Sequence, residues 1–205
     1  MDPKLLQTAK RHLTRRDEVL KKVIGAVGPC TLRVDDNHFA LLVRAIVSQQ
    51  ISTKAAAAIS GRLLKGVGRF QPKRLLDADE ATLQSAGLSR SKRLSIRDLA
   101  EKCLSGDVPL RKLASLENEE VVEALTQVRG IGPWTAEMFL IFSLGRPDVL
   151  PVGDYGLRAG VMKQYGLSEL PGKQRLHEIG EAWKPYRSIG TWYIWRSLGN
   201  VPQSE

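Results

Sequence analysis

The sequence predicts an all-α protein made of amphipathic helices joined by short loops. Apolar residues recur at helical spacing through most of the chain, and no segment shows the alternation typical of a half-buried strand. Short loops that contain Gly or Pro separate the periodic segments. The 205 residues are 42% hydrophobic and 26% charged, which is the composition of a folded globular protein rather than a disordered one.

The first half of the chain contains two clear helical patterns. A long helix is expected from Pro3 to Val27, where Gly28-Pro29 ends it. A second helix is expected over 38–50, and Ser52 or Thr53 is a suitable cap for the helix after it. The apolar residues of the first pattern are Leu5, Leu6, Ala9, Leu13, Leu20, Val23, Ile24 and Val27, and those of the second are Phe39, Leu42, Val43, Ile46 and Val47.

Helices also account for most of the remaining sequence. Asn118-Glu119-Glu120 has the polar and acidic residues of a helix start. The expected helices lie at about 79–86, 90–104, 118–126, 134–144, 154–165, 173–183 and 188–198. We expect 1–205 to form one compact unit of two helical lobes. These lobes are expected to comprise about 30–115 plus 116–165, the segment that bears the hairpin described below. The C-terminal segment, 166–205, is expected to pack with the N-terminal helix.

Charge and cysteine content limit the classes of partner and cofactor. Thirty-one Lys and Arg against 22 Asp and Glu give a net charge of +9, which favours nucleic acid first and an anionic membrane second. Cys30 and Cys103 are isolated and too few to ligate an iron–sulfur cluster. The chain has neither an apolar signal segment at its N-terminus nor a membrane-length apolar run, so an intracellular protein is expected.

The stretch from Leu125 to Ala136 reads as two helices joined by a tight turn. Gly130-Ile131-Gly132 supplies glycines that allow positive φ and close backbone approach, and Pro133 suits a first helical turn. Such a turn directs backbone N–H groups outward, which suits a phosphate oxygen. An ordinary helix–turn–helix corner, in which the glycines serve only geometry, is the alternative.

The sequence around this turn resembles that of a known family of enzymes. Val128-Arg-Gly-Ile-Gly-Pro-Trp-Thr-Ala136 is followed, 18 residues after Pro133, by Pro151-Val-Gly-Asp-Tyr155. This pattern resembles the helix-hairpin-helix (HhH-GPD) DNA glycosylase superfamily, and most closely the 3-methyladenine DNA glycosylase II family in a compact form without the N-terminal mixed domain. Three further segments agree, so that the resemblance spans about 38–200: Leu42-Val-Arg-Ala-Ile-Val-Ser-Gln-Gln-Ile-Ser52, Ala86-Gly-Leu-Ser-Arg-Ser-Lys92, and Trp183-Lys-Pro-Tyr-Arg-Ser188 with Trp195 beyond.

The resemblance implies that Asp154 is a catalytic carboxylate. Without it, an aspartate before a predicted helix is read as an N-cap, and the two roles are compatible. Alkylation makes a purine cationic and a good leaving group, while positive charge develops on the sugar as the N-glycosidic bond breaks. A carboxylate in a water-poor pocket stabilises that charge and can orient or deprotonate the attacking water. Asp148, in a turn-like Gly-Arg-Pro-Asp segment, is expected to be structural.

Residue 134 bears on the type of glycosylase. Relatives with lyase activity carry a lysine here, whose amine attacks the sugar. This chain has Trp134, which cannot do that chemistry, so the resemblance implies a monofunctional enzyme. Trp134, Trp195 and Met138 are expected to line the base pocket, where an indole face attracts a cationic purine. The alternative for the tryptophans is a core position, expected for at least Trp183 or Trp192.

The resemblance also implies residues that contact DNA. Gln50 is expected to fill the gap left by a flipped base, although a shift of one residue would make Ile51 the wedge. Gln49 and the hairpin residues Gly130, Ile131, Gly132 and Thr135 are expected to contact DNA, unless the glutamines are only solvated amides at a helix end. Arg90, Lys92 and Arg93 are either a solvated helix face or phosphate contacts. His12, His38 and His177 are expected at surface or packing positions.

Cofactor and partner expectations follow from the same resemblance. No cofactor is required, but main-chain carbonyls of Thr126, Val128 and Ile131 could bind Na+ or K+ at the hairpin. The expected activity is hydrolysis of the N-glycosidic bond of alkylated purines in base excision repair, on 3-methyladenine and possible further lesions such as 7-methylguanine. The expected partner is double-stranded DNA containing alkylated bases, and the protein is expected to bind it as a monomer. No membrane association is expected. The expected compartment is the cytoplasm or nucleoid of a bacterium or the nucleus of a eukaryote. A DNA-lesion-binding protein with little or no catalysis is the alternative.

Overall fold

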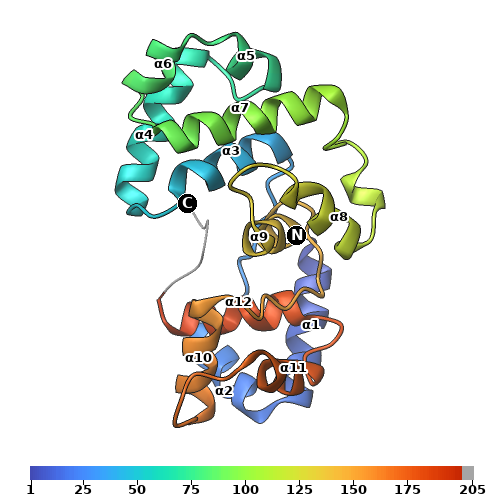
Figure 1. The fold of residues 1–205 in the computed structure, drawn as a ribbon. Helices are drawn as coiled ribbons and strands as arrows, with labels where there is room; N and C mark the ends of the chain where they lie inside the picture. Colours follow the sequence, from blue (N-terminus) through green and yellow to red (C-terminus); the bar gives the residue numbers. More distant parts are fainter. Residues whose placement is uncertain (200–205) are drawn as a thin grey trace. The chain divides into compact units, whose positions relative to one another are not determined.

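The computed structural model describes residues 1–199, and these are helical with no strand (Figure 1). The all-α prediction is therefore confirmed. The helices are α1 (Pro3–Arg16), α2 (Glu18–Val27), α3 (His38–Ser48), α4 (Thr53–Val67), α5 (Pro72–Asp77), α6 (Glu80–Ser85), α7 (Arg90–Ser105), η1 (Leu113–Ser115), α8 (Asn118–Thr126), α9 (Pro133–Phe142), α10 (Tyr155–Tyr165), α11 (Lys173–Glu181) and α12 (Arg187–Ser197). Within residues 1–199, every helix is too short or too polar to span a bilayer.

The chain divides into two compact units. The terminal unit joins Met1–Val34 to Leu140–Glu205, and the middle unit is Asp35–Phe139. The segment 116–165, which the sequence groups together, is thus divided between the units within α9. The terminal unit packs its C-terminal helix α12 against α2 and α1 from the N-terminus.

The predicted helix from Pro3 to Val27 is two helices, and Asp17 separates them. The backbone of Asp17 is extended, with φ −145°. Its Oδ1 accepts the N–H groups of Val19 and Leu20 at 2.9 Å, which caps α2. Its Oδ2 accepts the Tyr165 hydroxyl and, at 2.9 Å, Nε1 of Trp183. These hydrogen bonds favour a break that apolar periodicity alone does not reveal.

Close packing between α10 and α12 depends on a glycine. A Cβ on Gly160 would lie 2.3 Å from Cγ2 of Ile194, so a side chain there would force the two helices apart. The centre of α12 is buried, including Trp192 and Trp195. The absence of a side chain at residue 160 thus brings a buried part of α12 close to α10.

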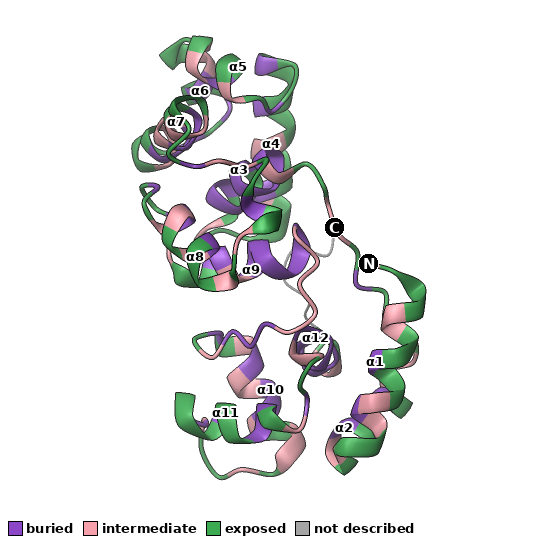
Figure 2. Cartoon of the chain, turned by 90° about the vertical axis from the view of Figure 1, so that its right-hand side faces the viewer, coloured by how far each residue is buried: buried purple, intermediate pink, exposed green. Residues whose placement is uncertain are grey.

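In the middle unit, α3 forms the most buried helix of the first half, with eight buried residues between Phe39 and Val47 (Figure 2). It packs against α4 and α7, while α5, which the apolar pattern does not predict, packs against α7. Helix α8 spans the predicted 118–126, but its N-cap is Glu117, which forms a capping box with Glu120. The other predicted helices of both units exist, with ends shifted by up to two residues.

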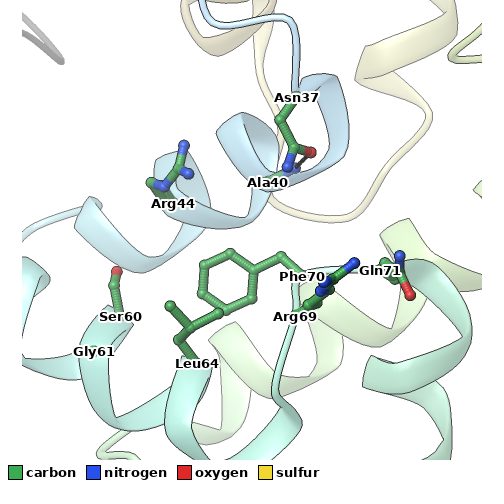
Figure 3. Close-up of a pocket in the computed structure, with 9 residues that line it drawn as sticks. All are labelled: Asn37, Ala40, Arg44, Ser60, Gly61, Leu64, Arg69, Phe70 and Gln71. Atoms are coloured by element: carbon green, nitrogen blue, oxygen red, sulfur yellow. Dashed lines mark hydrogen bonds between the residues drawn. The ribbon is translucent and has the colours of Figure 1, made fainter.

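A hollow of about 380 Å³ lies on the middle unit at the N-terminal end of α3. Arg44 of α3 and Asn37, the residue before α3, border the hollow on one side. Ser60 and Leu64 of α4 border it as well (Figure 3). Phe70 forms part of its apolar lining. No residue predicted to bind or cleave DNA lines this hollow, so the candidate functional site is elsewhere.

Candidate functional site

Asp154 lies in a tight loop at the start of α10. The Val152 N–H donates to the Leu150 carbonyl and the Asp154 N–H to the Pro151 carbonyl, both at 2.9 Å. The Asp154 side chain caps α10, because its Oδ1 accepts the Leu157 N–H at 2.5 Å. The predicted N-cap role is therefore confirmed. Asp154 is only 6% exposed, and a helix N-terminus favours a negative charge on a side chain that caps it.

Trp195 is the second donor to this carboxylate. Its indole Nε1 donates to Oδ1 of Asp154 at 2.8 Å. Its ring is fully buried and stacks on Phe142, with ring centroids 6.0 Å apart. The stacked ring and the hydrogen bond together fix the orientation of the carboxylate.

Gly156 leaves the room that this arrangement needs. A Cβ at this position would lie 3.2 Å from Oδ1 of Asp154 and 3.4 Å from Cδ1 of Trp195. Both distances are at or below ordinary van der Waals contact. A larger residue would therefore displace the carboxylate or the indole.

The predicted hairpin forms in the middle unit between α8 and α9. Ile131 N–H donates to the Val128 carbonyl at 3.0 Å, which closes the turn. Gly130 has φ 77°, and a Cβ there would lie 2.7 Å from Oγ of Ser95 on α7. The Arg129 N–H donates to Oδ2 of Asp98 at 2.7 Å, which attaches the turn to the same helix.

Asp98 also pairs with Lys102, one helical turn along α7, at 2.5 Å. Burial acts to raise the pKa of Asp98, but the hydrogen bonds from Lys102 and Arg129 outweigh it and hold that pKa below its ordinary value. The hairpin is thus attached to α7 by a carboxylate that is ionised at neutral pH.

The two hairpin glycines serve different purposes. Gly130 requires its positive φ and its close approach to Ser95, as predicted. Gly132 requires neither, because its φ is not positive and a Cβ there would meet open space. The positive φ that the turn allows is therefore used at Gly130 and not at Gly132, and close approach of a phosphate at Gly132 stays a prediction.

Helix α9 begins directly after the hairpin, at Pro133. Trp134 in its first turn is 40% exposed, which is unusual for so large an apolar side chain. Met138 is fully buried and Thr135 is 5% exposed. The expected pocket residues thus fall in different environments, with Trp134 exposed and Met138 and Trp195 buried.

The loop between α3 and α4, here called the insertion loop (Gln49–Ser52), contains the predicted wedge. Gln50 is exposed and has φ 59°, a left-handed conformation that non-glycine residues rarely adopt. Ile51 is 37% exposed, and Ser52 caps α4 through the Ala55 N–H, which confirms the first of the two predicted caps. The side-chain amide of Gln49 donates to the Gly130 carbonyl at 2.8 Å, which links this loop to the hairpin.

Two of the three basic residues at the start of α7, Lys92 and Arg93, bind the protein's own backbone. Lys92 Nζ donates to the carbonyls of Val47 and Gln49, at 2.7 and 2.8 Å. Partial burial lowers the pKa of the Lys92 ammonium below its ordinary value. Arg93 pairs with Glu80 at 2.6 Å and donates to the Leu88 carbonyl. Of the three, Arg90 is exposed.

Structural roles are also clear for Asp148 and two histidines. Asp148 accepts hydrogen bonds from the backbone and the guanidinium of Arg187, with Nε at 2.7 Å, so its predicted structural role is confirmed. His12 makes an edge contact with the ring of Tyr186, and His38 makes one with Phe139. Among the described residues, no three of His, Cys, Asp and Glu gather where they could hold a metal ion.

Three contributors were missed by reasoning from sequence: the indole of Trp195 as a donor to Asp154, and Lys92 and Asp98 as anchors of the two loops. The sequence separations of 41 residues for Trp195 and Asp154, and of 43 for Lys92 and Gln49, explain why no local pattern signalled these pairs.

Comparisons with known proteins identify the family. The family model described as "HhH-GPD superfamily base excision DNA repair protein" matches residues 43–185. DNA-3-methyladenine glycosylase 1 of Schizosaccharomyces pombe is 37% identical over 199 residues, which cover 94% of this chain and 87% of that protein.

Two solved structures are similar over nearly the whole chain. The S. pombe 3-methyladenine DNA glycosylase Mag1 in complex with abasic DNA has a TM-score of 0.82 and 34% identity, covering 97% of this chain and 100% of that one. A DNA-3-methyladenine glycosidase from Bacillus halodurans has a TM-score of 0.85 and 40% identity, covering 93% and 89%. These findings confirm the resemblance inferred from the hairpin and the Pro-Val-Gly-Asp segment, and the chain belongs to the HhH-GPD superfamily of base excision DNA repair proteins.

Proposed function

We propose that this protein is a monofunctional DNA glycosylase that hydrolyses the N-glycosidic bond of alkylated purines, with 3-methyladenine as the first expected substrate. The observation that carries the proposal is the buried Asp154 carboxylate, held by the Leu157 N–H and the Trp195 indole in a member of this superfamily. The names of the relatives support the substrate class.

Asp154 would act by charge. As the bond between sugar and cationic base breaks, positive charge develops on the sugar, and a fixed carboxylate in a water-poor environment stabilises it. The same carboxylate can orient the attacking water or accept its proton. Because a cationic base leaves without protonation, one carboxylate suffices, and lesions would be selected by their reactivity.

Trp134 supports both the substrate class and the monofunctional reaction. Its exposed indole offers a face on which a cationic purine can stack, with about 1–2 kcal/mol of cation–π attraction when desolvated. No amine exists at this position to attack the sugar, so the expected product is an abasic site with an intact backbone. We keep Met138 and Trp195 as further pocket residues in this proposal.

Double-stranded DNA is the proposed partner. The open space beside Gly132 and the N-terminus of α9 are suited to a phosphate, and Gln50 and Ile51 are exposed, as a residue that enters a duplex has to be. Gln49 holds the insertion loop to Gly130 rather than being only a solvated amide. We propose a monomer, since a helix-hairpin-helix contact needs no second copy.

A monovalent cation at the hairpin is part of the same proposal. Thr126 ends α8, where helix carbonyls lack intrahelical partners, and the Val128 carbonyl has a second lone pair besides the one that accepts Ile131 N–H. Neutral carbonyls of Thr126 at the end of α8 and of Val128 and Ile131 in the hairpin suit Na+ or K+. The ion would add positive charge beside a DNA phosphate.

The deciding experiment compares wild type with Asp154→Asn on DNA that carries radiolabelled methyl groups, followed by chromatography of the released bases. We expect wild type to release free 3-methyladenine. We expect Asp154→Asn to release it about 10²- to 10⁴-fold more slowly, because the variant lacks the negative charge of the carboxylate. Release of no base by wild type, despite binding to methylated duplex, would favour a non-catalytic lesion-binding protein. Equal release by both proteins would overturn the role of Asp154.

A further inference from the structure

Helix α7 holds both candidate DNA-contacting loops of the middle unit. From its N-terminal half, Lys92 donates to the carbonyls of Val47 and Gln49. One turn further along α7, Oγ of Ser95 lies 2.7 Å from where a Cβ on Gly130 would be. On the turn after that, Asp98 accepts the Arg129 N–H. One face of one helix therefore sets the positions of the insertion loop and of the hairpin.

Lys92 serves the insertion loop in a specific way. Val47 lies in the last turn of α3, where carbonyls lack intrahelical partners and the helix dipole is negative. An ammonium at this end satisfies the carbonyl and complements the dipole. Because Lys92 also binds the carbonyl of Gln49, it spans the point at which α3 ends and the loop begins.

The backbone beyond that point is strained. Gln50 has φ 59°, and a left-handed conformation costs a residue with a Cβ about 1 kcal/mol. Gln49 is fixed on one side by Lys92 and by its own bond to Gly130, and Ser52 is fixed on the other by capping α4. Gln50 and Ile51 thus project from a turn whose two ends are anchored.

We propose that Lys92 is a positioning residue for DNA insertion. It acts through the carbonyls of Val47 and Gln49 to hold the insertion loop in the strained conformation that presents Gln50. The inference rests on the proposed function, because it assumes that this loop enters the duplex. It assigns Lys92 neither to a phosphate contact nor to a solvated face, the two roles that the sequence left open.

The test uses the full-length protein and a duplex that holds a tetrahydrofuran abasic analogue beside 2-aminopurine. Insertion unstacks the neighbouring base and raises its fluorescence, without any excision step. We compare wild type with Lys92→Met, which keeps the length of the side chain but removes its donors, and with Lys92→Arg, which keeps donors and charge. Lys65→Met, on the exposed surface of α4, controls for the loss of one positive charge.

We expect Lys92→Met to reduce the fluorescence rise about tenfold, because it removes two charge-assisted hydrogen bonds from the loop. Lys92→Arg should restore most of the rise, and Lys65→Met should match wild type. The slope of log affinity against log salt should be unchanged in Lys92→Met, whereas loss of a phosphate contact reduces its magnitude by about one.

Three results would overturn the inference: an equal fluorescence rise in Lys92→Met and wild type, a reduced salt slope in Lys92→Met, or no rise in wild type bound to the duplex. If Lys92→Met does not fold, Lys92→Gln, which keeps one donor group without charge, is judged by the same criteria. A failure of the proposed function is distinguishable from a failure of this inference. If the protein is not a glycosylase, wild type releases no base, but the fluorescence assay still measures whether the insertion loop enters the duplex.

Discussion

Asp154 of the terminal unit is buried, whereas Gln50 and Gly130 of the middle unit are exposed. Asp154 is oriented by an indole and a helix N-terminus. The exposed loops are instead anchored from beneath by polar side chains of α7, which bind their backbone.

This difference matches what each region has to do under the proposed function. A carboxylate that stabilises developing charge works best where water is excluded. Groups that meet a DNA backbone have to lie at the surface, and their shape has to be held without covering them. Substitutions near Asp154 should therefore act on base release, and those near the hairpin and insertion loop on DNA binding and base flipping.

The largest of these effects is expected for Trp195→Phe. The substitution removes the indole donor but keeps an aromatic ring against Phe142, so Oδ1 of Asp154 loses one of its hydrogen bonds. A lost hydrogen bond to a buried charge corresponds to about 10- to 100-fold slower single-turnover base release. Affinity for abasic DNA should change little. Trp192→Phe on the same helix is the control, and equal loss in both variants would contradict a specific role for the indole.

Alanine substitutions at the two hairpin glycines are expected to separate an effect on stability from an effect on DNA binding. Gly130→Ala should lower the free energy of unfolding by about 2 kcal/mol, because it places a Cβ at positive φ and against Ser95. Gly132→Ala should leave stability within about 0.5 kcal/mol but weaken DNA binding about tenfold, since its Cβ would stand where a phosphate approaches. Urea unfolding and a binding titration separate the two effects. Normal DNA affinity in folded Gly132→Ala would exclude close approach at this glycine.

Gln50→Gly and Ile51→Ala decide which residue of the insertion loop is the wedge. Glycine relieves the left-handed strain at residue 50, so stability should not fall while the inserting side chain is lost. We expect Gln50→Gly to slow base release several-fold, by roughly fivefold if base flipping limits the reaction, and Ile51→Ala to have less effect. The opposite order, measured under single-turnover conditions, would assign the wedge to Ile51.

The smallest effect is expected at Asp98. Its pKa is held below the ordinary value in the folded protein, so its contribution is fully present above the unfolded pKa of about 3.9 and is lost as pH falls through the folded pKa. Asp98→Asn should lower the free energy of unfolding by about 1 kcal/mol at neutral pH, and the difference from wild type should shrink below about pH 4. Urea unfolding at several pH values measures it, and a difference that grows on acidification would contradict the assignment.

Much of the molecule is determined by local sequence. Helical periodicity and capping residues predicted most helices, because both depend on residues a few positions apart. The Pro-Val-Gly-Asp segment indicated the cap at Asp154, and the spacing of this segment from the hairpin carried the resemblance to the family. Gly130 was predicted correctly because a positive φ in a tight turn is a local requirement.

The tertiary structure decided what depends on distant partners. Asp17 breaks the first helix because Tyr165 and Trp183 reach it from the other end of the chain. Lys92 binds the carbonyls of Val47 and Gln49, because the end of α3 packs beside it. Trp195 orients Asp154 because Gly156 and Gly160 let α12 approach α10 closely. Hydrogen bonds between residues far apart in sequence depend on how helices pack, and no pattern within a single helix determines that packing.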